Sequence, residues 1–198
     1  MKETERIAKE TAENAGDAEN EAPRREIPAP DAAEVERRTR KYAADCVELL
    51  RKNKLTVTTA ESCTGGMVGS RLVDVPGCSD VYAEGYITYS NKAKRKLLNV
   101  SKATLRKYDA VSRQTAREMA IGAAFAANAD VAVSVTGLAG PDGGTEKRPV
   151  GLVFIGCYMD DRVTVEEHHF HGSRNEIRAQ AAMSALKLMK SVIAENTK

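Results

Sequence analysis

The sequence contains no tryptophan, and aromatic residues make up only 5% of its 198 positions. It also lacks any apolar run that approaches the ~20 residues of a membrane-spanning helix. Its N-terminus has neither the apolar core of a signal peptide nor the acid-poor composition of a transit peptide. We therefore expect a cytoplasmic protein without a membrane partner.

Cysteine and histidine are scarce, and their spacing argues against two kinds of site. The cysteines are Cys46, Cys63, Cys78 and Cys157. They lack the paired spacing of a zinc site and the density of a secreted disulfide scaffold, so we expect reduced thiols. The histidines are His168, His169 and His171. They crowd an expected strand end without metal-ligand spacing, so we expect surface residues and no metal.

Neither sign of charge dominates. Lys and Arg number 30 against 28 Asp and Glu, and the net charge of +2 gives no global field that favours nucleic acid. The local basic run at residues 92–96 has no aromatic binding platform beside it. We expect no nucleic-acid partner, whereas a small anionic ligand is compatible with this composition.

The composition changes at about residue 30. Residues 1–30 carry almost no large apolar side chains and end in a proline-containing run, so they cannot bury enough apolar surface to offset their ordering entropy. We expect a flexible N-terminal extension over residues 1–30. Residues 31–198 have the size and composition of one globular domain.

Strands and helices alternate along this domain. We expect helices over residues 31–53, 65–75, 91–99 and 112–128, and a last helix from a capping box at Ser173 and Glu176. We expect strands over residues 55–60, 81–90, 131–136, 151–160 and 162–170, the last two as a hairpin. Residues 131–136 are almost wholly apolar, which is typical of a central strand. The pattern predicts an α/β fold, a three-layer α/β/α sandwich around a mixed sheet.

Hydroxyl and thiol groups gather where the first expected strand ends, in the segment Thr59-Ala60-Glu61-Ser62-Cys63-Thr64-Gly65-Gly66. Open α/β sheets bind ligands at that edge, and backbone N–H groups at a helix start can stabilise a phosphate or an oxyanion. The alternative is that Ser62 and Thr64 merely cap the helix. The segment alone leaves both interpretations open.

A second segment, residues 86–94, brings a tyrosine and two lysines to the end of the next strand. Only about one free lysine in 10³ is neutral at pH 7, so a lysine base needs desolvation or nearby positive charge. Lys92, Arg95 and Lys96 could supply that charge to Lys94. A solvated basic helix face is the alternative.

A third segment, residues 136–145, is rich in glycine, which allows backbone to approach a ligand closely. It matches neither a P-loop nor a dinucleotide fingerprint, so a plain wide turn explains it equally well. Arg174, at the start of the last helix, could bind a phosphate bidentately or form a surface salt bridge.

Together these segments resemble the CinA C-terminal domain family. The match is carried by residues 60–66, 85–91 with 93–94, 110–112, and 137–144 with 149–151, and it extends over about residues 35–195. The resemblance is specifically to stand-alone members that hydrolyse nicotinamide mononucleotide to nicotinate mononucleotide and ammonia. It implies that no metal or organic cofactor is needed.

The resemblance also implies roles for individual residues. Ser62 is the expected nucleophile, Lys94 its base, and Tyr89 a further catalytic residue close to both. We expect the substrate, a pyridine nucleotide, to be bound by Cys63, Thr64, Gly65, Gly66, Thr136, Gly140 and Arg174. Arg174 is expected to bind the phosphate. A homo-oligomer is expected for so small an enzyme.

Two alternatives stay open at this stage. Cys63 is a rival nucleophile, because a thiol at a helix start can ionise near neutral pH. A protein of another class, a nucleotide-binding or regulatory module, would keep the pocket without turning over a substrate. The presence of Ser62, Tyr89 and Lys94 argues against that second alternative.

Overall fold

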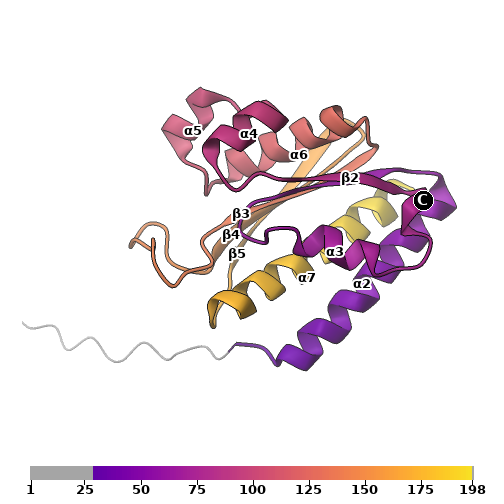
Figure 1. The fold of residues 1–198 in the computed structure, drawn as a ribbon, viewed down its shortest axis with the longest axis horizontal. Coiled ribbons are helices and arrows are strands. Elements are labelled where there is room, and N and C mark those ends of the chain that lie inside the picture. The colour runs from indigo at the N-terminus through magenta and orange to yellow at the C-terminus, as the bar shows by residue number, and fades with distance from the viewer. Residues whose placement is uncertain (1–28, 198) are drawn as a thin grey trace, which may run out of the picture.

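The computed structural model describes residues 29–197 of the chain. The expected flexible extension over residues 1–30 therefore lies outside the described residues, except for its last two. The described residues form an open five-stranded sheet with helices on both faces (Figure 1). This arrangement confirms the predicted three-layer α/β/α sandwich.

The sheet is mixed, as predicted. Its strands are β1 (Val57–Glu61), β2 (Tyr82–Ile87), β3 (Val131–Gly137), β4 (Leu152–Met159) and β5 (Arg162–His169). The strand order is β2-β1-β3-β4-β5. β1 runs parallel to β2 and β3, whereas β3, β4 and β5 are successively antiparallel. β3 is therefore the central strand, and residues 131–136 are all buried.

Three helices lie on each face of the sheet (Figure 1). One layer contains α2 (Ala32–Asn53), α3 (Met67–Val73) and α7 (Arg174–Asn196). The other contains α4 (Asn91–Leu98), α5 (Lys102–Tyr108) and α6 (Arg113–Ala127), and a short 3-10 helix, η1 (Cys78–Asp80), precedes β2. The pattern did not predict α5, because two turns capped by Ser101 are too short for a clear periodicity.

The sheet divides the core into two parts. Val131, Val133 and Val135 of β3 pack with buried side chains of α2 and α7. Ala132 points to the opposite face and packs with α6. There, α6 approaches α4 so closely that a Cβ on Gly122 would lie 1.9 Å from the Leu98 carbonyl oxygen. The absence of a side chain at Gly122 thus allows α4 to pack this closely against α6.

Local sequence signals account for several element ends. Asp31 caps α2, and Ser173 with Glu176 forms the predicted capping box of α7. Asp160 and Asp161 both have positive φ, 50° and 58°, which suits the two-residue turn of the predicted β4–β5 hairpin.

The cysteines, which were expected to be reduced, are all free and buried. Within residues 29–197, no helix combines the length and the apolar composition of a membrane span.

Candidate active site

The carboxyl ends of β1, β2 and β3 meet at one edge of the sheet. Immediately after β1, the Ser62 N–H donates to the Val135 carbonyl of β3 at 2.9 Å. Immediately after β2, the Thr88 N–H donates to the Glu61 carbonyl at 2.7 Å. The two segments that the sequence singled out therefore lie side by side, at the edge where open α/β sheets bind ligands.

Lys94 reaches Ser62 directly. Its Nζ lies 2.9 Å from the Ser62 Oγ and donates to the Thr88 carbonyl at 2.7 Å. The Ser90 hydroxyl caps α4 by accepting from the Ala93 N–H, and it places Lys94 in the first turn, on the buried side of the helix. Lys94 is only 1% exposed.

Burial lowers the pKa of Lys94 to about 8. At pH 7 about one such side chain in ten is neutral, against about one in 10³ for a free lysine. Of the two causes that the sequence left open for such a shift, burial is the one that acts, and the exposed side chains of Lys92, Arg95 and Lys96 are not its cause. A lysine with these properties can remove a proton from a hydroxyl.

Cys63 is a weaker candidate nucleophile than the sequence indicated. Its thiol is buried, and this burial raises its pKa to about 11. The thiolate of Cys63 is therefore rare near neutral pH. Cysteines at accessible helix starts ionise more readily, but Cys63 is buried.

The carboxylate of Glu61 occupies the start of α3. It is buried and accepts hydrogen bonds from the N–H groups of Gly66, Val68 and Gly69 at 2.9, 3.1 and 2.9 Å. Neither Ser62 nor Thr64 caps this helix, so the alternative reading of these hydroxyls is wrong. The helix start is likewise closed to a phosphate or an oxyanion.

One cavity of about 270 Å³ brings most of the predicted site residues together. Its predicted lining residues are Ser62, Cys63, Tyr89, Lys94, Thr136, Gly140 and Arg174. The other lining residues lie in segments that carry the family resemblance but were not among the expected site residues: Ala110, Val111, Gly137, Leu138, Ala139 and Asp142. Within residues 29–197, no group of three His, Cys, Asp or Glu side chains is placed to hold a metal ion.

Thr64, Gly65 and Gly66 do not line this cavity, contrary to the expectation. Thr64 is fully buried, and its Oγ1 has no hydrogen-bond partner among the described residues. The Gly65 N–H is bound to the Ser62 carbonyl and the Gly66 N–H to Glu61. The physical reason is that the N–H groups at the start of α3 are turned to the buried Glu61 carboxylate.

Tyr89 and Arg174 lie at an exposed part of the cavity. The Arg174 guanidinium donates to the Gly140 carbonyl at 2.6 Å and to the Tyr89 hydroxyl at 3.0 Å. No ion pair of residues 29–197 includes Arg174. Its positive charge is therefore available to an anionic ligand. Because Lys94 reaches Ser62 directly, Tyr89 is not needed as a bridge between them.

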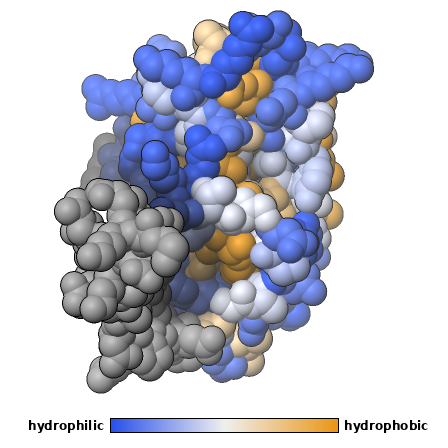
Figure 2. Space-filling view, turned by 90° about the vertical axis from the view of Figure 1, so that its left-hand side faces the viewer, coloured by the Kyte–Doolittle hydropathy of each residue, from blue (hydrophilic) through white to orange (hydrophobic). Residues whose placement is uncertain are grey.

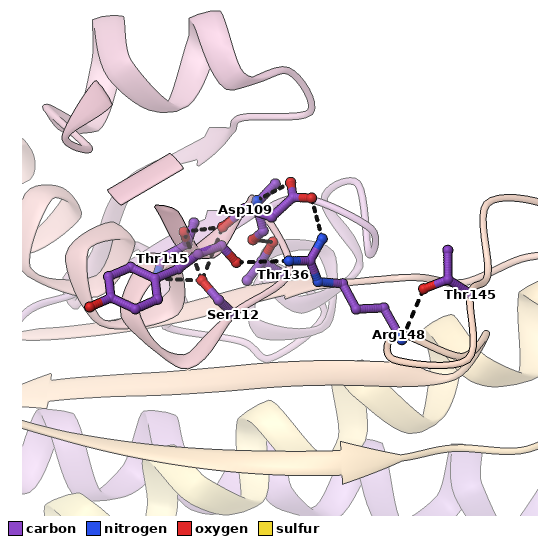
Figure 3. Close-up of polar contacts among 8 residues, drawn as sticks. Asp109, Ser112, Thr115, Thr136, Thr145 and Arg148 are labelled. Carbon is purple, nitrogen blue, oxygen red and sulfur yellow. Dashed lines mark hydrogen bonds and ion pairs between the residues drawn. The ribbon is translucent and has the colours of Figure 1, made fainter. Parts of the chain in front are cut away.

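A polar network that includes the lining residue Thr136 adjoins the cavity (Figure 3). Thr136, a predicted substrate residue, donates its hydroxyl to the Ala110 carbonyl at 2.7 Å. The Asp109 carbonyl accepts from Ser112 and Thr115, and the Asp109 carboxylate pairs with Arg148 of the β3–β4 loop. Through the hydrogen bond between Thr136 and Ala110, the network joins the end of β3 to the segment before α6, and both residues line the cavity.

The end of the molecule from which the β3–β4 loop projects is mainly polar (Figure 2). On the part of this face that the described residues cover, hydrophobic side chains show only as small patches among hydrophilic ones. Such a surface suits a polar ligand better than an apolar one.

Sequence reasoning missed two supporting residues. Glu61 stood inside the first motif, but nothing in the pattern showed that it caps α3. Arg178 donates to the Cys63 and Thr64 carbonyls at 3.1 and 2.9 Å. The available signal was its position four residues after Arg174, on the same side of a helix.

Comparison with known proteins identifies the family. The model of the CinA C-terminal domain matches residues 39–193. The chain belongs to the CinA C-terminal domain family. A CinA-like protein of Kosmotoga olearia is 52% identical over 147 residues, which is 74% of this chain and 36% of that protein. The chain spans about a third of the length of the curated relatives it matches.

Solved structures of CinA proteins share the fold. The crystal structure of the competence/damage inducible protein CihA from Agrobacterium tumefaciens is 40% identical, with a TM-score of 0.76. The match covers 80% of this chain and 96% of that one. A CinA superfamily protein from Escherichia coli is 34% identical, with a TM-score of 0.74, over 79% of this chain and 90% of that one.

The lowered pKa of Lys94 makes the stability of this CinA domain depend on pH. Its folded pKa, about 8, lies below its usual 10.5, so the unfolded chain binds more protons between these values. The free energy of unfolding should rise by about 2 kcal/mol between pH 8 and pH 10, relative to Lys94→Met. Urea titrations over this range measure the difference. Lys96→Met, on the exposed side of α4, is the control; equal pH slopes in wild type and Lys94→Met would contradict the expectation.

The Asp109–Arg148 pair should control local opening rather than global stability. Both side chains are partly exposed, at 51% and 39%, so the pair contributes about 1 kcal/mol or less. Arg148→Met should speed amide hydrogen exchange in residues 108–112 by up to about fivefold and leave the melting temperature nearly unchanged. Mass spectrometry measures the exchange, with Arg37→Met as the surface control. Unchanged exchange in that segment would show that the pair does not hold those residues.

Proposed function

We propose that this CinA domain hydrolyses the carboxamide of nicotinamide mononucleotide to nicotinate mononucleotide and ammonia. The observation that carries the proposal is the 2.9 Å contact between the Lys94 Nζ and the Ser62 Oγ. This contact lies in a setting whose burial lowers the pKa of the lysine to about 8. The side chains that line the cavity supply the remaining requirements of a serine amidohydrolase.

Acylation begins when neutral Lys94 takes the proton of the Ser62 hydroxyl. The Ser62 Oγ then bonds to the carboxamide carbon, and the carbonyl oxygen becomes an oxyanion. When this intermediate collapses, the carbon–nitrogen bond breaks, the amide nitrogen takes the proton from Lys94, and ammonia leaves. The Thr88 carbonyl holds the Nζ in place during these transfers. An ester on Ser62 remains.

Deacylation repeats the same proton transfers with water. Lys94 takes a proton from a water molecule, which attacks the ester carbon. The ester bond then breaks, Ser62 recovers its proton from Lys94, and nicotinate mononucleotide leaves. The net reaction consumes one water molecule and needs no redox partner.

The oxyanion requires donors near Ser62. The Gly65 and Gly66 N–H groups already have acceptors, but those of Cys63 and Thr64 donate to no acceptor among residues 29–197. In better-known hydrolases, one such donor lowers the activation barrier by roughly 3–4 kcal/mol. Of these two residues only Cys63 lines the cavity, so we assign the oxyanion to the Cys63 N–H group and not to the whole segment up to Gly66.

Substitution of the paired side chains tests the reaction. Ser62→Ala and Lys94→Met should each lower kcat for ammonia release by about 10²–10⁴-fold. In the wild type, kcat/KM should rise about tenfold per pH unit up to a pKa of about 8 and then level off, because the neutral lysine is the active form. An enzyme-coupled ammonia assay measures both effects.

Cys63→Ala is the matched control, and it should retain kcat within about threefold because the thiol is not the nucleophile. Near-normal turnover by Ser62→Ala or Lys94→Met would make the assignment wrong. A wild-type protein that shows a thermal shift with the mononucleotide but releases no ammonia would be a binding or regulatory module instead.

The uncompensated charge of Arg174 should favour the phosphorylated substrate. Arg174→Met should raise KM for the mononucleotide by roughly 10- to 100-fold, since a charge-assisted hydrogen bond contributes about 1.5–3 kcal/mol. KM for the riboside, which lacks the phosphate, should change far less. The ratio of the two changes in KM distinguishes phosphate binding by Arg174 from its hydrogen bonds with Gly140 and Tyr89. Equal losses for both substrates would assign Arg174 to the loop alone.

A further inference from the structure

The loop after Ser62 is a hydrogen-bonded turn with two unoccupied N–H groups. The Gly65 N–H donates to the Ser62 carbonyl at 3.1 Å, which closes a four-residue turn. Cys63 and Thr64 occupy its central positions. The direction of their N–H groups depends on how firmly the two peptide planes of the turn are held.

A trans peptide is planar, so the carbonyl of one residue and the N–H of the next point in opposite directions. A group that fixes a carbonyl therefore also aims the following N–H. The Ser62 carbonyl is fixed by Gly65, and this aims the Cys63 N–H. The Cys63 carbonyl is fixed by the Arg178 Nε at 3.1 Å, and this aims the Thr64 N–H.

Arg178 holds this loop from a different element. It stands on α7, donates through Nη2 to the Thr64 carbonyl at 2.9 Å, and so grips two successive peptide groups. No ion pair of the described part of the chain includes Arg178. Its third nitrogen, Nη1, donates to the Asn175 side-chain oxygen at 3.4 Å, so the guanidinium joins the turn to the first turn of α7.

We infer that Arg178 is a positioning residue for the reaction: by holding the Cys63 and Thr64 carbonyls, it fixes the turn after Ser62 and with it the direction of the Cys63 N–H, which receives the oxyanion in the cavity. Arg178 does not line the cavity and so has no direct contact with the substrate there. The inference rests on the proposed function in that it takes nicotinamide mononucleotide as the natural substrate. The positioning role of Arg178 requires only that Ser62 is acylated.

The test compares three arginine variants. Arg178→Met keeps the stem and removes the donors, Arg178→Lys keeps the charge without the fork, and Arg71→Met removes a partly buried arginine of α3 that pairs with Glu36 and Asp74. Arg178→Met should lower kcat for ammonia release by about 10- to 100-fold, below the full loss of a donor, with KM within about threefold. Arg178→Lys should fall in between, and Arg71→Met should match the wild type.

Hydrolysis of p-nitrophenyl acetate, with Ser62→Ala as the baseline, measures the acylation of Ser62 without the nucleotide. Its rate should fall in parallel with kcat. If the wild type hydrolyses the ester but releases no ammonia from the mononucleotide, the proposed function is wrong. The inference about Arg178 is then tested by the rates of ester hydrolysis alone.

A kcat within twofold of wild type in Arg178→Met would overturn the inference. So would a raised KM at constant kcat, because Arg178 would then bind substrate. Thermal unfolding establishes that each variant is folded. If Arg178→Met does not fold, Arg178→Lys decides, because its ammonium still reaches one carbonyl: about a tenfold loss of kcat supports the inference and wild-type kcat overturns it.

Discussion

The structure of the site depends on an amine that is buried beside a hydroxyl without a carboxylate to balance it. Lys94 is almost fully buried, and its Nζ forms hydrogen bonds with the Ser62 hydroxyl and the Thr88 carbonyl, both neutral. A buried ammonium with only neutral partners is costly, and the protein lowers this cost by releasing the proton. The fold must therefore place Lys94 by other means, and the helix that carries it, α4, packs closely against α6 at Gly122.

Glu61 and Lys94 are both buried, but the protein satisfies them differently. The carboxylate of Glu61 has three backbone donors, which is a favourable environment for a charged acceptor. The amine of Lys94 has two oxygens and no opposite charge. Sites that run acid–base chemistry near neutral pH commonly place titratable groups in environments that differ in this way. Here Glu61 stabilises the segment that follows Ser62, and Lys94 has the lowered pKa that the proposed reaction requires.

The sequence predicted those features that depend on local pattern. Alternation and apolar runs located every strand, and Asp31, Ser173 and the Asp160-Asp161 turn marked element ends. The Ser62–Lys94 pair came from linked motifs, not from periodicity. What the pattern could not give was contact between distant segments: the Glu61 cap, the Arg178 grip, and the reason for the lysine pKa, which is burial and not its neighbours on α4.

Helix α7 contacts two of the loops at the cavity. Arg174 holds the Gly140 carbonyl of the glycine-rich loop, and Arg178, four residues later, holds the loop after Ser62. Ile177, between them, is buried in the core that α7 shares with the sheet. Because residues four apart share one side of a helix, a rotation or shift of α7 would move both arginines together. A single core helix therefore links the position of the loop after Ser62 to that of the glycine-rich loop.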